Sequence, residues 1–316
     1  MSRLCTVTAY NIRGSKGVTA TVAWEWLSDQ GISLLDPTRW LTDRDLDFIV
    51  KATATRRTDH DRIREIIRDK PDFLEVLLDD ERLFARMASD DEILLKVSPQ
   101  LLFTVLLRRV RKLLRDAAFT VETGPEGHLP VFDASRTARL LERPGVLPYL
   151  AHMLASFVRT ESRAVLVRRG QTYQRRVFSD MDVDDLMEMA EIVEPERRFA
   201  VYKRLGDVSL FLLGLFPEHV SRPQGRARGV AASWGARQRR PREPEEYVRL
   251  GEASYRRAAD EQGAQRMGLS EVLAVLGDHF LLASKPLNVL SRQIIPLQRF
   301  YWFLPLPRRT GPEAAG

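Results

Sequence analysis

The sequence predicts a mainly α-helical protein, a multi-helix body that carries two small β-hairpins. Three observations predict this fold class. Helix-start residues recur ahead of short apolar segments, apolar side chains in these segments repeat every three or four residues, and β-favouring runs occur in pairs around glycine. The 316 residues are 44% hydrophobic and 29% charged, which is typical of a globular protein. We divide them into an N-terminal helical domain over 1–117, a central region over 118–198 and a C-terminal helical domain over 199–316.

Four start signals predict the helices of the N-terminal domain. Thr42 precedes DRDLDFIVKATA, Asp72 lies in PDFLEVLL, and Asp90 lies in DDEILLKV. Ser98 and Pro99 precede the longest helix, LLFTVLLRRVRKLLRD. Each signal places a capping side chain or a proline in the first turn, where backbone N–H groups lack partners. The predicted apolar face of the longest helix consists of Phe103, Leu106, Leu107, Val110, Leu113 and Leu114. The opposite face is a basic stripe of Arg108, Arg111, Lys112 and Arg115, which we interpret as the solvated side of a core helix.

The central region alternates hairpins with helices. Residues 118–132, AFTVETGPEGHLPVF, contain two β-favouring runs around Gly-Pro-Glu-Gly and predict a hairpin. Asp133 is expected to cap a short helix, and VLPYLAHMLASFVR predicts a second helix directly after it. A second hairpin is predicted over 163–178, followed by a helix that begins in SDMDVDDLMEMAEIV.

The order helix, turn, helix, hairpin between Asp133 and Phe178 resembles a winged helix-turn-helix, a DNA-binding arrangement. The resemblance is topological. It implies that the second helix enters the major groove of DNA and that the hairpin contacts the DNA phosphate backbone. The side chains expected at such an interface are Tyr149, His152, Ser156, Arg159, Arg168, Arg169, Arg175 and Arg176. The first helix is short and the second unusually apolar, so the alternative is that both pack inside a larger helical body.

The C-terminal domain contains an arginine-rich loop over residues 222–242, RPQGRARGVAASWGARQRRPR. The stretch has seven arginines, no acid and no apolar periodicity, which predicts a mobile loop. Such a loop can bind a polyanion, or it can simply be solvated. The residues of the loop expected to contact nucleic acid are Arg226, Arg228, Trp234, Arg237, Arg239 and Arg240. Helices are predicted in the remainder of the domain, before a disordered tail over residues 304–316.

The charge of the chain favours an anionic partner only weakly. The net charge is +6, but 42 of the 49 basic residues are arginine, a skew that codon usage alone can produce. The distribution is more informative, because residues 41–100 carry a net charge of −4 and residues 101–178 a net charge of +8. Positive charge is therefore concentrated in the middle of the chain.

No motif predicts a reaction, a metal or a cofactor. Cys5 is the single cysteine, which excludes a disulfide within the chain, and His60-Asp61 lacks the further histidines of a metal site. Four acids have the spacing of a calcium loop, but Asp185 occupies the place of the required glycine. These four are Asp180, Asp182, Asp184 and Glu191. The loop GSKG, between a β-favouring run and an expected helix, lacks the glycines of a phosphate-binding loop, and we interpret it as a turn.

The sequence leaves three function classes open. The first is a nucleic-acid-associated regulator without catalytic activity, and the second is a helical scaffold that binds a protein partner or forms a homo-oligomer. The third is a small-molecule-binding protein or enzyme with a pocket near Asp207, whose buried carboxylate needs a partner such as Tyr255 or Arg256; Asp278-His279 is a similar case. We expect a cytoplasmic protein, since no export signal is visible in MSRLCTVTAYNIRGSKG. We expect no membrane partner, since the longest apolar run, Val208–Phe216, is too short to cross a bilayer.

Overall fold

The computed structural model describes residues 6–9, 18–21, 37–54, 59–90, 92–124, 127–158, 162–169, 172–217 and 242–294. Within these ranges the protein is mainly helical, as the sequence predicts. The loop from 222 to 241, the GSKG segment and the tail over 304–316 lie outside the described residues, so their predicted conformations stay predictions.

The chain forms two compact units. Unit 1 comprises residues 1–30, 160–280 and 304–316, and unit 2 comprises 31–159 and 281–303. Both units combine stretches that are distant in the sequence. In unit 2, α7 (Pro99–Asp116) contacts α8 (Ala134–Glu142) and α9 (Val146–Ser156), which lie beyond the domain boundary expected at residue 117. The division into three domains stays a prediction.

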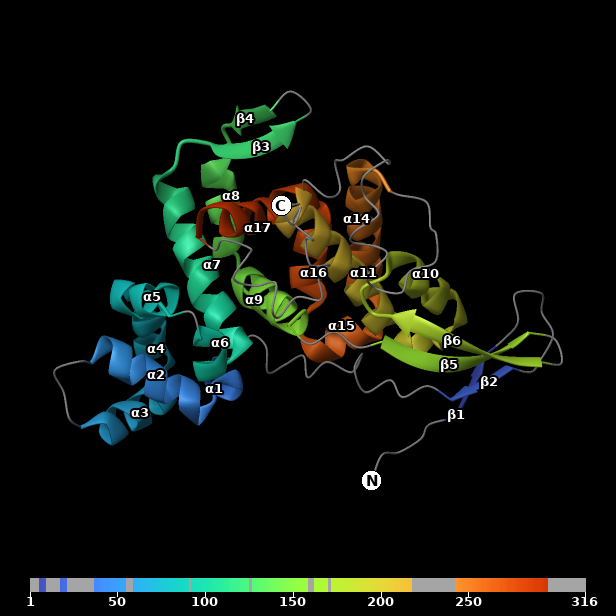
Figure 1. Ribbon diagram of the computed structural model, residues 1–316, viewed down its shortest axis with the longest axis horizontal. Coiled ribbons are helices and arrows are strands. Elements are labelled where there is room, and N and C mark those ends of the chain that lie inside the picture. Colours follow the sequence, from blue (N-terminus) through green and yellow to red (C-terminus); the bar gives the residue numbers. More distant parts are fainter. Residues whose placement is uncertain are drawn as a thin grey trace, which may run out of the picture. The chain divides into compact units, whose positions relative to one another are not determined.

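Unit 2 is built on the long helix α7, Pro99–Asp116. Helices α8 and α9 pack against α7, as do α4, α5 and the π-helix η2. The elements around α7 in this unit, drawn from blue to green with α17 and η2 in red, can be followed in Figure 1. They are α1 (Pro37–Trp40), α2 (Asp43–Thr53), α3 (His60–Asp69), α4 (Pro71–Leu78), α5 (Glu81–Ala88), α6 (Ile93–Lys96), β3 (Thr120–Gly124), β4 (Gly127–Val131), α8 (Ala134–Glu142), α9 (Val146–Ser156), α17 (Phe280–Val289, from Leu281 onward) and η2 (Leu290–Ile294).

Two of the predicted start signals meet at one buried carboxylate. Thr42 caps α2, because its hydroxyl accepts from the Asp45 N–H at 3.1 Å, and Asp45 accepts in return from the Thr42 N–H at 3.0 Å. The Ser98 hydroxyl accepts from the Leu101 N–H at 3.1 Å and so caps α7. The second oxygen of Asp45 accepts from the Ser98 N–H at 2.7 Å. Asp45 thereby ties the start of α7 to the start of α2.

Of the other predicted start signals, Asp72 and Asp90 lie at helix starts as expected, whereas Asp133 has a different role. Asp72 lies inside the first turn of α4, behind Pro71, where an acid favours the positive end of the helix dipole. Asp90 accepts from the Glu92 N–H at 3.0 Å ahead of α6. Asp133 precedes α8 but makes no capping hydrogen bond, because its carboxylate binds Thr120 and Lys285 instead. The predicted role of Asp133 as a helix cap is therefore wrong.

Unit 1 consists of helices and two antiparallel hairpins. Its elements are β1 (Thr6–Ala9), β2 (Val18–Thr21), β5 (Ser162–Arg169), β6 (Thr172–Ser179), α10 (Val183–Ile192), α11 (Pro195–Leu215), α14 (Pro244–Asp260), α15 (Gln262–Met267) and α16 (Ser270–Asp278). The hairpin of β1 and β2 was not predicted, and β2 lies beside β5. Because β2 begins at Val18, the GSKG segment leads into a strand and not into the expected helix. The two predicted hairpins are present as β3–β4 and β5–β6.

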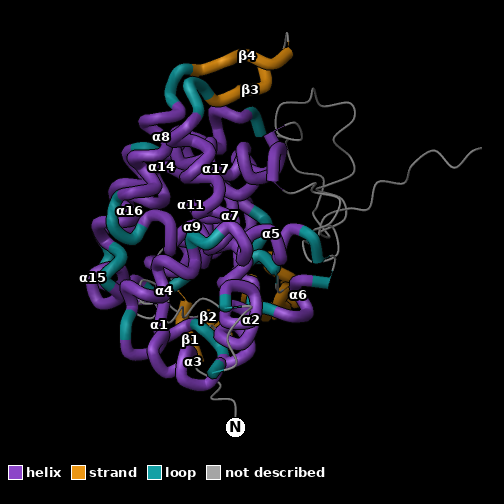
Figure 2. The backbone as a smooth tube through the Cα atoms, turned by 90° about the vertical axis from the view of Figure 1, so that its left-hand side faces the viewer, coloured by secondary structure: helices purple, strands orange, loops and turns teal. Residues whose placement is uncertain are grey.

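The core of unit 1 is the pair α11 and α14, which approach each other closely at a glycine. A methyl group placed on Gly206 would lie 2.5 Å from the ring of Tyr255, so glycine is required for this approach. Tyr255 is fully buried and packs against Phe280, with ring centroids 5.8 Å apart. In Figure 2 helices, drawn in purple, predominate over strands, drawn in orange, among the described residues.

Candidate nucleic-acid interface

The hairpin β5–β6 divides its arginines between two faces. Residues directly opposite in an antiparallel pair share a face, and successive residues alternate between faces. Arg168 pairs with Tyr173 and Leu166 with Arg175, which places Arg168 and Arg175 on one face of the backbone register. Arg169 pairs with Thr172 and Val165 with Arg176, which places Arg169 and Arg176 on the other. The four predicted phosphate contacts therefore form two pairs.

The exit strand of this hairpin is fixed to the first turn of α10. Strand β6 ends at Ser179, whose N–H donates to the Asp185 carboxylate at 3.0 Å. Asp182 caps α10 by accepting from the N–H groups of Asp184 and Asp185, at 2.9 and 3.1 Å. The acidic run that resembles a calcium loop thus binds backbone N–H groups at a helix start.

A buried ion pair connects the same turn to α11. The Arg204 guanidinium donates to the Asp180 carboxylate at 2.6 Å and to the Asp180 carbonyl oxygen at 3.1 Å. The two side chains are 9% and 7% exposed, so neither charge is well solvated. Removal of one partner would leave the other charge buried without its ion-pair partner. The base of the hairpin is therefore rigidly attached to the helical core of unit 1.

The arginine-rich loop ends at this turn as well. Arg242, the last of its seven arginines, donates to the Asp184 carboxylate of α10 and lies 3.6 Å from the Met187 sulfur. Tyr247 of α14 lies near these groups. The pKa of its phenol is raised, mainly by burial and further by Asp182 and Asp184, while Arg242 partly opposes the rise. The predicted contacts Arg226, Arg228, Trp234, Arg237, Arg239 and Arg240 lie outside the described residues.

The helices predicted to accompany the hairpin belong to the other unit. α8 and α9 lie in unit 2, whereas β5 and β6 lie in unit 1, so a winged-helix arrangement is not confirmed. Tyr149 on α9 is fully buried, because this helix is apolar on nearly every side and packs against α7. We therefore correct its assignment from a base contact to a core residue. His152 and Ser156 are partly exposed, and the Ser156 hydroxyl donates to the Met153 carbonyl oxygen at 2.6 Å; Arg159 is outside the described residues.

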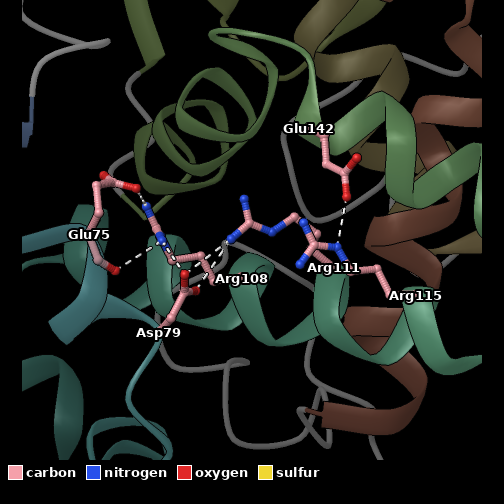
Figure 3. Close-up of polar contacts among 6 residues, drawn as sticks. All are labelled: Glu75, Asp79, Arg108, Arg111, Arg115 and Glu142. Atoms are coloured by element: carbon pink, nitrogen blue, oxygen red, sulfur yellow. Dashed lines mark hydrogen bonds and ion pairs between the residues drawn. The ribbon is translucent and has the colours of Figure 1, made fainter. Parts of the chain in front are cut away.

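The basic stripe of α7 is neutralised by acids from neighbouring helices. Figure 3 shows the carboxylates of Glu75 and Asp79 around Arg108, which is only 8% exposed. Asp79 also accepts from Arg111, and the stripe ends in an ion pair of 2.7 Å between Arg115 and Glu142. Glu81 pairs with two further cations of the helix, Arg109 and Lys112. We therefore correct the interpretation of this stripe as a merely solvated face, since its cations bind α4, α5 and α8.

The carboxylate of Asp207 has its partners inside the core of unit 1. Tyr255 donates to one carboxylate oxygen at 2.8 Å, as the sequence suggested, and Lys203 donates to the other at 3.0 Å. Arg256, the alternative partner, instead donates to Asp278 at the exposed end of α16, at 3.0 Å. His279 follows as the residue after that helix and is partly exposed. Asp207 therefore has the structural role of a satisfied buried carboxylate.

The described part of the chain contains no group of three or more His, Cys, Asp or Glu side chains placed to hold a metal ion. His60 and Asp61 stand at the start of α3, where Asp61 pairs with Arg64. Cys5 lies outside the described residues. Of the helices that the structure describes, none has the length and apolar character needed to cross a membrane.

Several of these contacts join residues far apart in the sequence. Arg204 lies 24 residues from Asp180, and Arg242 lies 58 residues from Asp184. The sequence did signal both acids and Arg242, since they belong to the acidic run and to the arginine-rich loop, but not their pairing. Comparison with protein-family models, with curated proteins and with solved structures gave no match.

Proposed function

We propose that this protein is a nucleic-acid-associated regulator that binds the phosphate backbone through the hairpin β5–β6 and the loop over 222–242. The supporting observation is that both basic segments end at the start of α10. Strand β6 ends at Ser179, and the loop ends at Arg242 on Asp184, five residues later. Guanidinium groups from the two segments can therefore reach the same stretch of phosphates, where they release counterions and gain affinity.

The charge pairing of α7 narrows the proposal to these two segments. Five cations of α7 have carboxylate partners within the unit, so binding a polyanion there would first require those ion pairs to break. The net charge of +8 over residues 101–178 therefore overstates the charge available to a ligand. Within that range, β5 and β6 hold Arg163, Arg168, Arg169, Arg175 and Arg176.

The two faces of the hairpin supply a matched pair of variants. One double variant carries Arg168→Ala with Arg175→Ala, and the other carries Arg169→Ala with Arg176→Ala. We predict that only one of the two lowers affinity for duplex DNA and reduces the slope of log K against log salt by about 2 units. The other double variant removes equal charge from the opposite face and should retain most of the slope. The measurement is fluorescence anisotropy of a labelled duplex at several salt concentrations.

Three outcomes of this titration are informative. A loss confined to one face supports a defined contact surface, and it also identifies that face. Equal and small losses in both variants would indicate attraction by net charge alone. No loss in either variant would remove the hairpin from the interface.

A second candidate function is a helical scaffold that binds a protein partner. The favouring observation is an exposed apolar surface on unit 2, where Phe132 is 79% exposed and Phe119, whose ring contacts it, is 45% exposed. This candidate predicts a defined oligomer or complex and no affinity for nucleic acid.

A further inference from the structure

The hairpin β3–β4 of unit 2 presents one apolar face. Val121 lies directly opposite Pro130 in the register, and the rings of Phe119 and Phe132 meet edge-on at the open end of the strands, with centroids 6.0 Å apart. Alternation along each strand places these four residues on the same face. Phe119, Pro130 and Phe132 are exposed, and Val121 is partly exposed.

The opposite face of the hairpin is fixed to the unit. Thr120, which is 5% exposed, donates to the Asp133 carboxylate at 2.5 Å. Lys285 of α17 donates to the other oxygen of Asp133. The face that carries Thr120 is therefore attached to the unit at the base of the hairpin, whereas Leu129 on the same face is 57% exposed. Figures 1 and 2 show the hairpin at the adjoining ends of α7 and α8. A two-stranded hairpin is marginal by itself, so an uncovered outer face of this kind favours a bound segment.

The contact between Lys285 and Asp133 brings the last described helix close to the hairpin. Ile294 follows Lys285 by nine helical positions, a rise of at most about 14 Å. The chain continues beyond the described residues with IPLQRFYWF, residues 295–303, which can span about 30 Å when extended. This segment places four aromatic residues in succession, Phe300 to Phe303.

We propose that residues 297–303 of the same chain dock on the outer face of β3–β4 and cover Phe119 and Phe132. Aromatic rings of the segment pack against the exposed phenylalanine pair in offset or edge-to-face geometry, as aromatic pairs prefer. A tether this short gives an effective concentration in the millimolar range, so the chain's own segment has an advantage over a separate partner of equal intrinsic affinity. This inference concerns unit 2 and is independent of the proposed nucleic-acid function.

Hydrogen exchange of the full chain, read by mass spectrometry, tests the proposal. The amides of residues 297–303 should exchange at least about tenfold more slowly in the wild type than in the double variant Phe119→Ser with Phe132→Ser. Val76→Ser is the matched control, because Val76 is 68% exposed on α4 of the same unit and should leave this exchange unchanged. The reverse variant, Tyr301→Ser with Trp302→Ser, should speed exchange in β3 and β4, and it carries the test even where the serine pair loosens the hairpin.

Three results would overturn the proposal. The segment over 297–303 exchanges in the wild type as fast as an unstructured peptide, or its protection survives in the Phe119 and Phe132 variant, which would mean that it docks elsewhere. Protection that disappears on dilution would assign the face to a second copy of the chain.

Discussion

At the scale of single residues, the buried carboxylates of Asp45, Asp133 and Asp207 each have specific hydrogen-bond donors. Asp45 accepts from the backbone at two helix starts, Asp133 binds Thr120 and Lys285, and Asp207 binds Lys203 and Tyr255. Desolvation of a charge is costly unless such donors replace water. The sequence predicted that Asp207 needs a partner and suggested Tyr255. It did not reveal the role of Asp133, because Lys285 is 152 residues away.

The buried ion pair of Asp180 with Arg204 provides a direct test of how strongly such charges depend on their partners. We predict that Asp180→Ala lowers the free energy of unfolding by about 3–5 kcal/mol, because Arg204 would remain buried without its carboxylate. Asp278→Ala is the control, since it removes an ion pair with Arg256 whose side chains are 51% and 62% exposed. That loss should stay below about 1 kcal/mol. Urea unfolding measures both, and losses of the same size would argue against a buried structural pair.

At the scale of elements, sequence patterns predicted where helices begin more accurately than they predicted which side chains are buried. Thr42 and Ser98 cap α2 and α7 as predicted, since capping depends on residues within one turn. Helical periodicity assigned Tyr149 to an accessible face of α9, but tertiary packing buries this apolar helix more completely than a one-sided pattern predicts. The acids that neutralise α7 come from α4, α5 and α8, and no local pattern links them to that helix.

The close contact between α11 and α14 determines whether Gly206→Ala raises or lowers the free energy of unfolding. Gly206→Ala should destabilise unit 1 by about 1–3 kcal/mol, because the added methyl group would overlap the buried ring of Tyr255. On an exposed helix the same substitution would stabilise by about 0.5–1 kcal/mol. Thermal or urea unfolding distinguishes the two, and a stabilised variant would mean that the helices are not packed as closely as described.

At the scale of the whole molecule, the charge pairing changes the interpretation of the net charge. The sequence totals placed the positive charge in the middle of the chain, and the structure distributes that region over two units. In unit 2 the cations of α7 pair with acids, whereas in unit 1 the hairpin β5–β6 and the end of the arginine-rich loop both attach to the first turn of α10. Total charge could not predict this division, because it depends on which carboxylates fold next to which guanidinium groups.

The most direct test of the proposed function is a titration of the intact protein with a labelled duplex at 50 and 200 mM salt. If six or more arginines of the hairpin and the loop contact phosphates, affinity should fall by about a thousandfold or more between the two concentrations. Absence of binding at the lower concentration, or binding that does not change with salt, would contradict a phosphate-binding role.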